Sequence, residues 1–482
     1  MLYLEGCRDG ARLREALALA REKGKPVVAI KLGRTDAGAR AASSHTAALA
    51  GSDAIFDAMF RQYGVYRATS IEEFFDIGVA TALGRLPQGA ASAWSRSRGG
   101  VGVLMADDAA SRGLDVTPLP ADARAKMKAL VPYAGVENPL DVTGQMLSDV
   151  GLLTKGMEII LEGSNYHSVV CFLGASLKNP VFAKTLEPAW QRIAAEFPDR
   201  SLSIAGLIDH GTRLMLDQLR IPTFREPTHA TRAMAAMNGF REVSERRLSA
   251  PLVRGDMPAL PPAPITELSA MACLRAAGLP TVDQRLAGSA DEAVAAAEAI
   301  GLPVVLKVVS PDILHKSDIG GVKVGLGTAD AVREAFETIV ANARKAMPAA
   351  RIDGCLVAPM VRGGVETILG ITRDPVFGPV VMFGLGGIFV EALGDVSFRL
   401  APFGEDEAHR MIDEIRGRKV LDGVRGAPPA DLDALAKALS TMSAFAAHHA
   451  DTLLSAEANP FVVFEKGAMA LDAVIERVSQ NG

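Results

Sequence analysis

One histidine, His45, lies in the segment ARAASSHTAALAGSD (residues 39–53), where nearly every neighbour is an alanine, serine, threonine or glycine. Imidazole is a common nucleophile and proton carrier near neutral pH. Almost no large side chain surrounds it to pack against the ring. Two interpretations follow: a surface turn with an incidental histidine, which is the usual case, or a loop that presents the imidazole to a large, charged and mobile group.

A second candidate is Lys307, the only charged residue in the apolar segment PVVLKVVSP (residues 303–311). A charge in such a strand needs a partner or a route to water. Lys307 is either an edge-strand lysine that extends to solvent or a phosphate-binding lysine. The following segment HKSDIGGVKVGL favours phosphate binding, because Gly320 and Gly321 permit a close approach of the backbone to phosphates.

Residues that suit a nucleoside follow further along the chain. The expected strand CLVAPMV (residues 355–361) offers backbone donors and acceptors for an adenine edge. Glu366 is expected on the next strand, placed for a ribose or an amino group. A lysine, a glycine-rich turn, a strand and a carboxylate in this order are a more specific signal of a nucleotide site than any one of these features alone.

Near the C-terminus, the strand pair in SAEANPFVVFEKGAMALDAVI brings Glu457, Asn459 and Asp472 to one face. Mg²⁺ binds through oxygens of one or two side chains and of substrate phosphates. Each carboxylate alone is usually a solvated turn residue. Taken with Lys307, the three predict a site for a magnesium nucleotide.

These residues need elements that position them, and strand-like and helix-like segments alternate throughout the chain. That alternation predicts the α/β class with parallel sheets. We expect a first domain over residues 1–90, a doubly wound domain over 91–248, a proline-rich linker over 249–263 and a last domain over 264–482. The last domain opens with TELSAMACLRAAGLP, a predicted helix with Thr266 as its N-cap and Gly278 at its end.

Composition excludes several classes of function. The net charge of −5 argues against a nucleic-acid partner. The four cysteines are scattered without a CxxC pair, which is typical of a reducing cytoplasm. We find no signal peptide and no apolar run near the ~18 residues of a membrane span, so the sequence predicts a cytoplasmic protein without a membrane partner.

The motifs of the last domain, from about residue 264 to 478, resemble an ATP-grasp domain. LHKSDIGGV, VETILGITRDPVFGPVVMFGLGGIFVE and AEANP followed by LDA are similar to the version in NDP-forming acyl-CoA synthetases, the family of ADP-forming acetate–CoA ligase and succinyl-CoA synthetase. The resemblance implies that ATP or ADP is held by Lys307, Gly320, Gly321, Val357, Ala358, Pro359, Met360 and Glu366. It implies that Asn459 and Asp472 hold Mg²⁺, with Glu457 beside them.

The segment KPVVAIKLGRTDAGARAASSHTAALAGSD resembles the part of this family that carries a phosphohistidine, within a flavodoxin-like domain. The resemblance implies that His45 shuttles a phosphoryl group between ATP and the acid, so that one difficult transfer becomes two in-line steps. Small neighbours suit a loop that moves, and helix N-termini would favour the phosphate. His315 is either a second carrier or a phosphate-binding residue.

The resemblance therefore predicts an NDP-forming acid–CoA ligase, in which acid, CoA and ATP give acyl-CoA, ADP and phosphate. The first alternative is a non-catalytic ATP-binding remnant or a regulatory subunit of the same family. The second alternative, ranked last, is part of a protein lysine acyltransferase.

Two departures from the family pattern carry further expectations. The family's CoA-binding domain has no counterpart here, which predicts an N-terminal truncation and a need for a CoA-binding subunit or a homo-oligomer. ASAWSRSR (residues 91–98) has poor strand character where the family has a valine-rich strand. A local shift of reading frame is one explanation of that segment.

Overall fold

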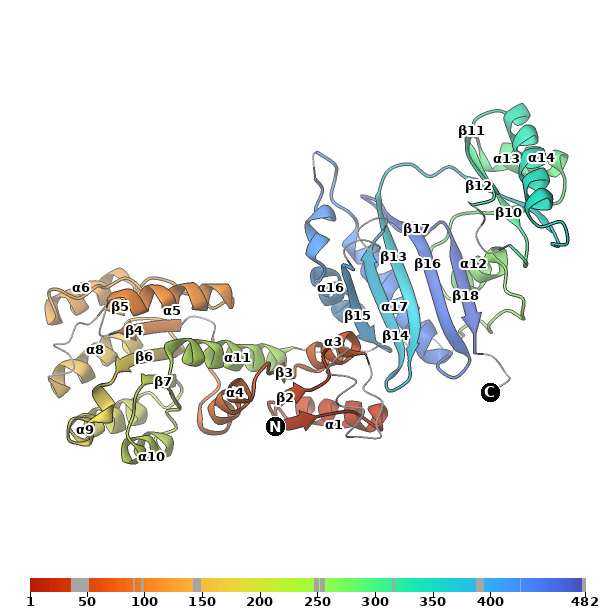
Figure 1. Ribbon diagram of the computed structural model, residues 1–482. Helices are drawn as coiled ribbons and strands as arrows, with labels where there is room; N and C mark the ends of the chain where they lie inside the picture. Colours follow the sequence, from red (N-terminus) through yellow and green to blue (C-terminus); the bar gives the residue numbers. More distant parts are fainter. Residues whose placement is uncertain are drawn as a thin grey trace. The chain divides into compact units, whose positions relative to one another are not determined.

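The computed structural model describes residues 1–35, 52–89, 92–96, 99–141, 149–246, 251, 256–313, 316, 318–386, 394–424 and 426–478. The chain divides into two compact units. Unit 1 comprises Met1–Gly6, Arg12–Ala50 and Tyr63–Arg246, and unit 2 comprises Cys7–Ala11, Gly51–Gln62 and Arg247–Gly482. Both are α/β structures (Figure 1), which confirms the predicted class.

Unit 1 contains two parallel sheets. The first has the order β1 (Leu2–Leu4), β2 (Val28–Lys31), β3 (Tyr66–Arg67). The second has the order β5 (Leu140–Asp141), β4 (Ser92–Arg96), β6 (Ser168–Gly174), β7 (Ser201–Gly206), β8 (Thr223–Phe224). The parallel pairing confirms the doubly wound pattern expected for this part of the chain.

Helices connect and cover these strands. They are α1 (Gly10–Glu22), α4 (Ile71–Leu83), α5 (Gly99–Ser111), α6 (Ala121–Leu130), α8 (Val150–Glu162), α9 (Pro180–Glu196), α10 (His210–Gln218) and α11 (Pro227–Glu245). The helix α3 (Asp53–Tyr63) belongs to unit 2 except for its last residue. One apolar core joins residues on both sides of position 90, including Ile30 of β2, Ile77 of α4, Met105 of α5 and Met234 of α11. The two sheets of unit 1 are therefore not energetically independent.

The expectation of poor strand character around Ser92–Arg96 is wrong, because these residues form β4. This strand pairs with β6 along its whole length and with β5 at its end. Strand propensity depends strongly on context, and two flanking strands supply the ladder that the local sequence does not favour.

Unit 2 has two antiparallel sheets, so the parallel pairing expected throughout the chain is wrong here. The smaller sheet has the order β11 (Val322–Leu326), β10 (Val304–Val309), β12 (Gly354–Pro359), β9 (Arg285–Ala287). The helices α13 (Ala290–Ile300) and α14 (Ala329–Ala346) share its apolar core. Antiparallel pairing arises where short turns join consecutive strands, as in the step from β13 to β14 at residues 375–377.

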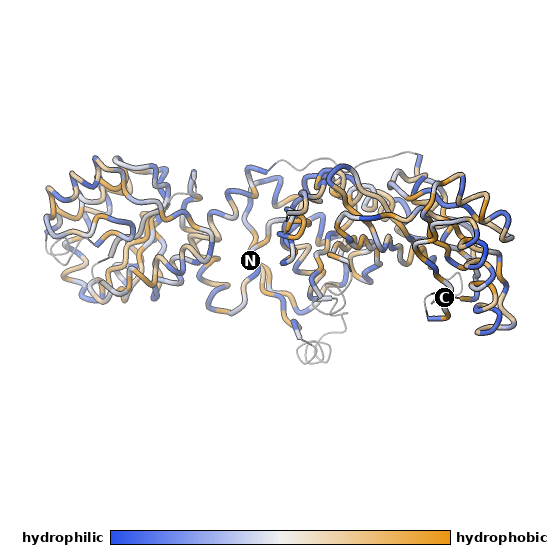
Figure 2. The backbone as a smooth tube through the Cα atoms, turned by 90° about the horizontal axis from the view of Figure 1, so that it is seen from above, coloured by the Kyte–Doolittle hydropathy of each residue, from blue (hydrophilic) through white to orange (hydrophobic). Residues whose placement is uncertain are grey.

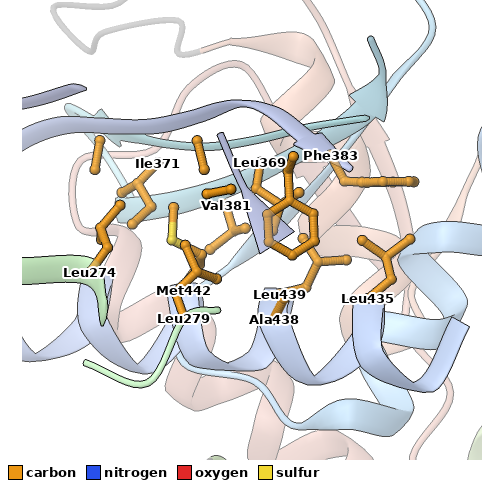
Figure 3. Packing of buried hydrophobic residues seen from close by; sticks show 14 of the residues in the cluster. Leu274, Leu279, Leu369, Ile371, Val381, Phe383, Leu435, Ala438, Leu439 and Met442 are labelled. Carbon is orange, nitrogen blue, oxygen red and sulfur yellow. The ribbon is translucent and has the colours of Figure 1, made fainter. Parts of the chain in front are cut away.

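The larger sheet has the order β15 (Val396–Leu400), β14 (Gly378–Leu385), β13 (Val365–Asp374), β16 (Leu453–Val463), β17 (Ala468–Ala470), and β18 (Ala473–Arg477) also pairs with β16. It packs with α12 (Glu267–Ala276), α16 (Glu405–Asp413) and α17 (Leu432–His448). Figure 3 shows Leu439 and Met442 of α17 packed against Leu369 of β13 and Phe383 of β14.

Apolar and hydrophilic residues alternate along the backbone of both units, as one-sided burial of helices and strands requires (Figure 2). Within the described ranges, no helix combines the length and the apolar composition that a membrane crossing would need.

Candidate active site

The side chain of Lys307 is held by two carboxylates. Its strand β10 lies between β11 and β12, so the edge-strand interpretation is wrong. The ammonium donates to Glu267 Oε1 at 2.9 Å, to Asp472 Oδ2 at 2.7 Å and to the carbonyl of Leu471 at 3.3 Å. The strand therefore positions an ammonium that comes from the smaller sheet among oxygens that come from the larger sheet and α12.

Glu267 is the centre of this cluster, and its side chain is only 3% exposed. It is the first residue of α12, whose N-cap is Thr266, as predicted. Its second oxygen, Oε2, accepts from the ammonium of Lys316. A carboxylate in the first turn of a helix is also favoured by the helix dipole.

Charges within the cluster shift the ionisation of its members. Burial alone would raise the pKa of Glu267, but the ammoniums of Lys307 and Lys316 outweigh it and lower the pKa. Burial alone would lower the pKa of Lys307, but Glu267 and Asp472 raise it. Both groups are therefore charged near neutral pH.

Asp472 differs from Glu267. Burial raises the pKa of this carboxyl, and the charge of Glu267 adds to the rise, while Lys307 opposes it. Asp472 is the member of the cluster that a divalent cation would stabilise most, because a cation adds the charge compensation that the protein supplies incompletely.

The two predicted glycines form the turn that leads into β11. Gly320 has φ +65, in the left-handed region that favours glycine. A Cβ at Gly321 would lie 2.7 Å from Val308 Cγ1 and 2.8 Å from the carbonyl oxygen of Lys316. The close approach seen here is thus to the chain itself, and the approach to phosphates stays a prediction.

The predicted adenine-binding residues end strand β12. Val357 pairs with both β10 and β9, whereas Ala358 and Pro359 pair with β10 and lie beyond the register of β9. The amide of Met360 donates to the carbonyl of Pro303 at 3.0 Å. The backbone of this strand end therefore presents one edge that β9 does not cover.

Glu366 lies on β13, the strand after β12, as expected. It is exposed and pairs with Val462 of β16. Its carbonyl accepts from the amide of Gly386 at 2.8 Å, so its backbone is anchored.

The three predicted magnesium ligands are linked by hydrogen bonds, one of them to the backbone of Asp472. Asn459 Nδ2 donates to Glu457 Oε1 at 2.9 Å, and the amide of Asn459 donates to the carbonyl of Asp472 at 3.2 Å. Among the described residues, no three histidine, cysteine or acidic side chains converge on one metal position. Two carboxylates and an amide nevertheless fit Mg²⁺ that completes its coordination with phosphate oxygens and water.

Both predicted phosphate carriers, His45 and His315, lie outside the described residues. The described chain flanks His45 with β2 on one side and α3 on the other. Sequence reasoning missed Glu267 and Lys316, which the structure joins to Lys307. Each has one local signal in the sequence. Glu267 is the acidic residue in the first turn of α12, and Lys316 directly follows His315.

The two antiparallel sheets of unit 2, with a lysine on one and acidic and amide side chains on the other, define an ATP-grasp domain. Residues 263–476 match the family model described as ATP-grasp domain. Residues 1–81 match the model described as succinyl-CoA ligase like flavodoxin domain.

Similar proteins extend this class to most of the chain. The acetate–CoA ligase [ADP-forming] I of Archaeoglobus fulgidus is 35% identical over 98% of this chain and 69% of its own length. The 4-hydroxybutyrate–CoA ligase [ADP-forming] of Nitrosopumilus maritimus is 32% identical over 97% of this chain and 68% of its own length. A solved acetyl-coenzyme A synthetase 1 of Ca. Korarchaeum cryptofilum, in complex with coenzyme A and Ca-AMPCP, is 43% identical over 44% of this chain and 93% of that chain, with a TM-score of 0.44.

The chain belongs to the family of ADP-forming acyl-CoA ligases, enzymes that form carbon–sulfur bonds. This membership supports the ligase over the non-catalytic remnant. The expected N-terminal truncation and the expected absence of a CoA-binding domain are not confirmed by these comparisons.

Proposed function

We propose that this chain catalyses the reaction of a carboxylic acid, CoA and ATP to acyl-CoA, ADP and phosphate through a phosphohistidine. The observation that carries the proposal is the partly buried ammonium of Lys307, held between Glu267 and Asp472 in an ATP-grasp domain. Such a preorganised charge stabilises a transferring phosphoryl group without further rearrangement.

In this proposal Lys307 binds a phosphate of ATP, and the strand end Val357–Met360 receives the adenine edge. Glu366 accepts a hydrogen bond from the ribose or from an amino group. Asn459, Asp472 and Glu457 hold Mg²⁺, which neutralises charge on the phosphates when bound. In this proposal the nucleotide lies between the two sheets of unit 2, whose strands carry most of these residues.

The relay has three balanced steps. An imidazole nitrogen of His45 attacks the γ-phosphorus of ATP, so that a P–N bond forms, a P–O bond breaks and ADP leaves. The carboxylate of the acid then attacks the phosphorus, and acyl phosphate forms as the P–N bond breaks. The thiolate of CoA attacks the acyl carbon and releases phosphate. His315 is either an intermediate carrier or a ligand of the phosphate.

The relay is tested with ATP labelled at the γ-phosphate and Mg²⁺. We expect acid-labile, base-stable label on the wild type and its loss in His45→Ala. His210→Ala, which changes an exposed histidine, is the matched control and should keep the label. No label on the wild type, or equal label on His45→Ala, contradicts the relay. His315→Ala separates the two roles of His315. If this variant loses the label while its nucleotide affinity is unchanged, His315 is a phosphoryl carrier; if both are lost, it is a phosphate-binding residue.

We further propose CoA as co-substrate, with a CoA-binding subunit or a second copy of this chain supplying part of its contacts. The support is family membership, since some relatives of this chain are named as separate alpha and beta subunits. Mass photometry with and without CoA, followed by an activity screen of small carboxylic acids, tests the assembly and the choice of acid. A monomer that forms acyl-CoA unaided contradicts this part of the proposal.

A further inference from the structure

Two lysines share one buried carboxylate in unit 2, and only one of them was expected in the site. Glu267 accepts from Lys307 through Oε1 and from Lys316 through Oε2. The two ammoniums come from different segments, β10 and the turn that precedes β11. A carboxylate that only needed neutralisation would require one lysine, so the second calls for an explanation.

We propose that Lys316 is a second phosphate-binding residue of the nucleotide site, and that Glu267 is the positioning residue that holds both ammoniums toward the phosphates. This inference rests on the proposed function, because it assigns further residues to the same ATP site. It concerns Lys316 and Glu267 themselves and does not depend on the neighbouring His315.

Distance supports the pairing. Hydrogen bonds of ordinary length from both oxygens of one carboxylate place the two ammoniums no more than about 7 Å apart. Two ammoniums within this limit are close enough to contact neighbouring phosphate groups of one nucleoside diphosphate or triphosphate. Like charges at such a separation repel, and the ionised Glu267 offsets that repulsion from the buried side.

The exposed fractions of the three side chains show which side of the cluster faces solvent. The Glu267 side chain is 3% exposed, whereas Lys316 is 20% and Lys307 is 16% exposed. An ammonium has three donors, and within the described residues Lys316 Nζ gives one of them to Glu267. The carboxylate thus anchors both lysines from the more buried side, and Lys316 Nζ, with this single acceptor among the described residues, has donors left for an anion.

Charge balance points to the same ligand. The cluster has two ammoniums and two carboxylates, because Asp472 also pairs with Lys307. When Asp472 binds Mg²⁺, Lys307 and Lys316 are left with Glu267 alone, and the local charge becomes positive. Phosphate groups restore neutrality, which couples the metal, the nucleotide and both lysines.

Calorimetric titration of the full chain with Mg-ADP and with AMP tests this inference. We expect Lys316→Ala to weaken Mg-ADP binding about tenfold or more and to change AMP binding less than threefold, since one charge-assisted contact to a phosphate is lost. Lys316→Arg should recover part of the affinity. Lys345→Ala, at an exposed position in α14, is the charge-matched control and should bind as the wild type does.

Glu267→Gln keeps the size of the side chain and removes its charge. We expect this variant to weaken Mg-ADP more than AMP, because the two ammoniums repel and lose their common orientation. Equal loss of both ligands would instead indicate a general structural role and would overturn the positioning assignment. A folded state that matches the wild type by circular dichroism is the condition for the comparison, and Lys316→Ala provides independent evidence if Glu267→Gln unfolds.

The two proposals fail in different ways. If the wild type does not bind Mg-ADP, the proposed nucleotide function is wrong. If the wild type binds and Lys307→Ala does not, while Lys316→Ala binds both ligands normally, the function stands and the second lysine is excluded.

Discussion

At the scale of single residues, Glu267 has the least exposed side chain among the four charged residues of the cluster, Glu267, Lys307, Lys316 and Asp472. Its carboxylate is satisfied twice, by Lys307 and by Lys316. Removing one partner of a buried ion pair leaves the others uncompensated, which typically costs about 3–5 kcal/mol. This residue therefore ties the stability of unit 2 to the geometry of the nucleotide site.

The first prediction concerns the pH dependence of that stability. The folded-state pKa of Glu267 is lowered, so its contribution is complete above the unfolded-state pKa of about 4.3 and disappears as pH falls through the lower folded-state pKa. We expect Glu267→Gln to lower the free energy of unfolding by about 3 kcal/mol at pH 7, and by less as pH falls below about 4. Urea unfolding followed by circular dichroism at several pH values measures the difference.

Glu405→Gln is the matched control, since Glu405 is an exposed acid in the first turn of α16. We expect an effect within about 1 kcal/mol. A destabilisation by Glu267→Gln that stays the same as pH falls from 7 to well below 4 would contradict the assignment of an ionised, lysine-paired carboxylate.

The second prediction concerns the thiols. Burial raises the pKa of Cys171 and of Cys355 to about 12. Because the thiolate is the reactive form, we expect neither residue to react with iodoacetamide at pH 8 in the folded protein, and both to react in urea. Peptide mass spectrometry reads the outcome, with the partly exposed Cys7 as the internal comparison. Rapid labelling of Cys355 in the folded protein would show that β12 opens readily.

At the scale of elements, the turn into β11 decides how close Lys316 lies to the smaller sheet. The amide of Gly321 donates to the carbonyl of Lys316, and its own carbonyl accepts from the amide of Val308, both at 2.8 Å. These bonds fix the turn against β10. The glycine is required because its neighbours leave no room for a side chain.

The third prediction follows from this contact. We expect Gly321→Ala to lower the free energy of unfolding by about 1–3 kcal/mol, since the added methyl group overlaps Val308 and the Lys316 carbonyl. Mg-ADP affinity should fall as well, because the Lys316 side chain moves with the turn. Thermal unfolding and calorimetric titration measure the two effects.

Gly327→Ala is the matched control, because it makes the same change just after β11 at a position where the added Cβ would have no heavy atom within 4 Å. We expect stability within about 0.5 kcal/mol of the wild type. If both alanine variants behave alike, the tight turn is not what positions Lys316.

At the scale of the whole molecule, the two units carry separate spectroscopic signals. The chain has two tryptophans, Trp94 and Trp190, and both belong to unit 1. The proposed nucleotide ligands belong to unit 2. Tryptophan fluorescence therefore reports the unfolding of unit 1, while circular dichroism reports both units.

The fourth prediction uses that division. We expect Mg-ADP at about 100 times its Kd to stabilise unit 2 by about 2.7 kcal/mol and to raise its thermal midpoint by roughly 5–10 °C. The thermal midpoint of unit 1, measured by tryptophan fluorescence, should not change. A shift of the fluorescence midpoint alone would locate the nucleotide in unit 1 and contradict the assignment of the site.

The sequence by itself determined the α/β class, the order of the ATP-grasp motifs and the importance of Lys307, because these depend on local periodicity and on a single charge in an apolar strand. It did not predict β4, since Ser92–Arg96 becomes a strand only through pairing with its neighbours. It indicated the hairpin-like strand pair near the C-terminus, but not the antiparallel pairing of β10 with β12 or of β13 with β14, which depends on how the strands are connected.

Only the tertiary structure decided which charges meet. Glu267 reaches Lys307 across 40 positions, and Lys307 reaches Asp472 across 165. No local pattern encodes such pairs, because they form where separate elements pack and bury their polar ends together, and burial makes an unpaired charge too costly to keep. The same physical requirement brings Lys316, which the motifs did not single out, to the carboxylate that holds Lys307.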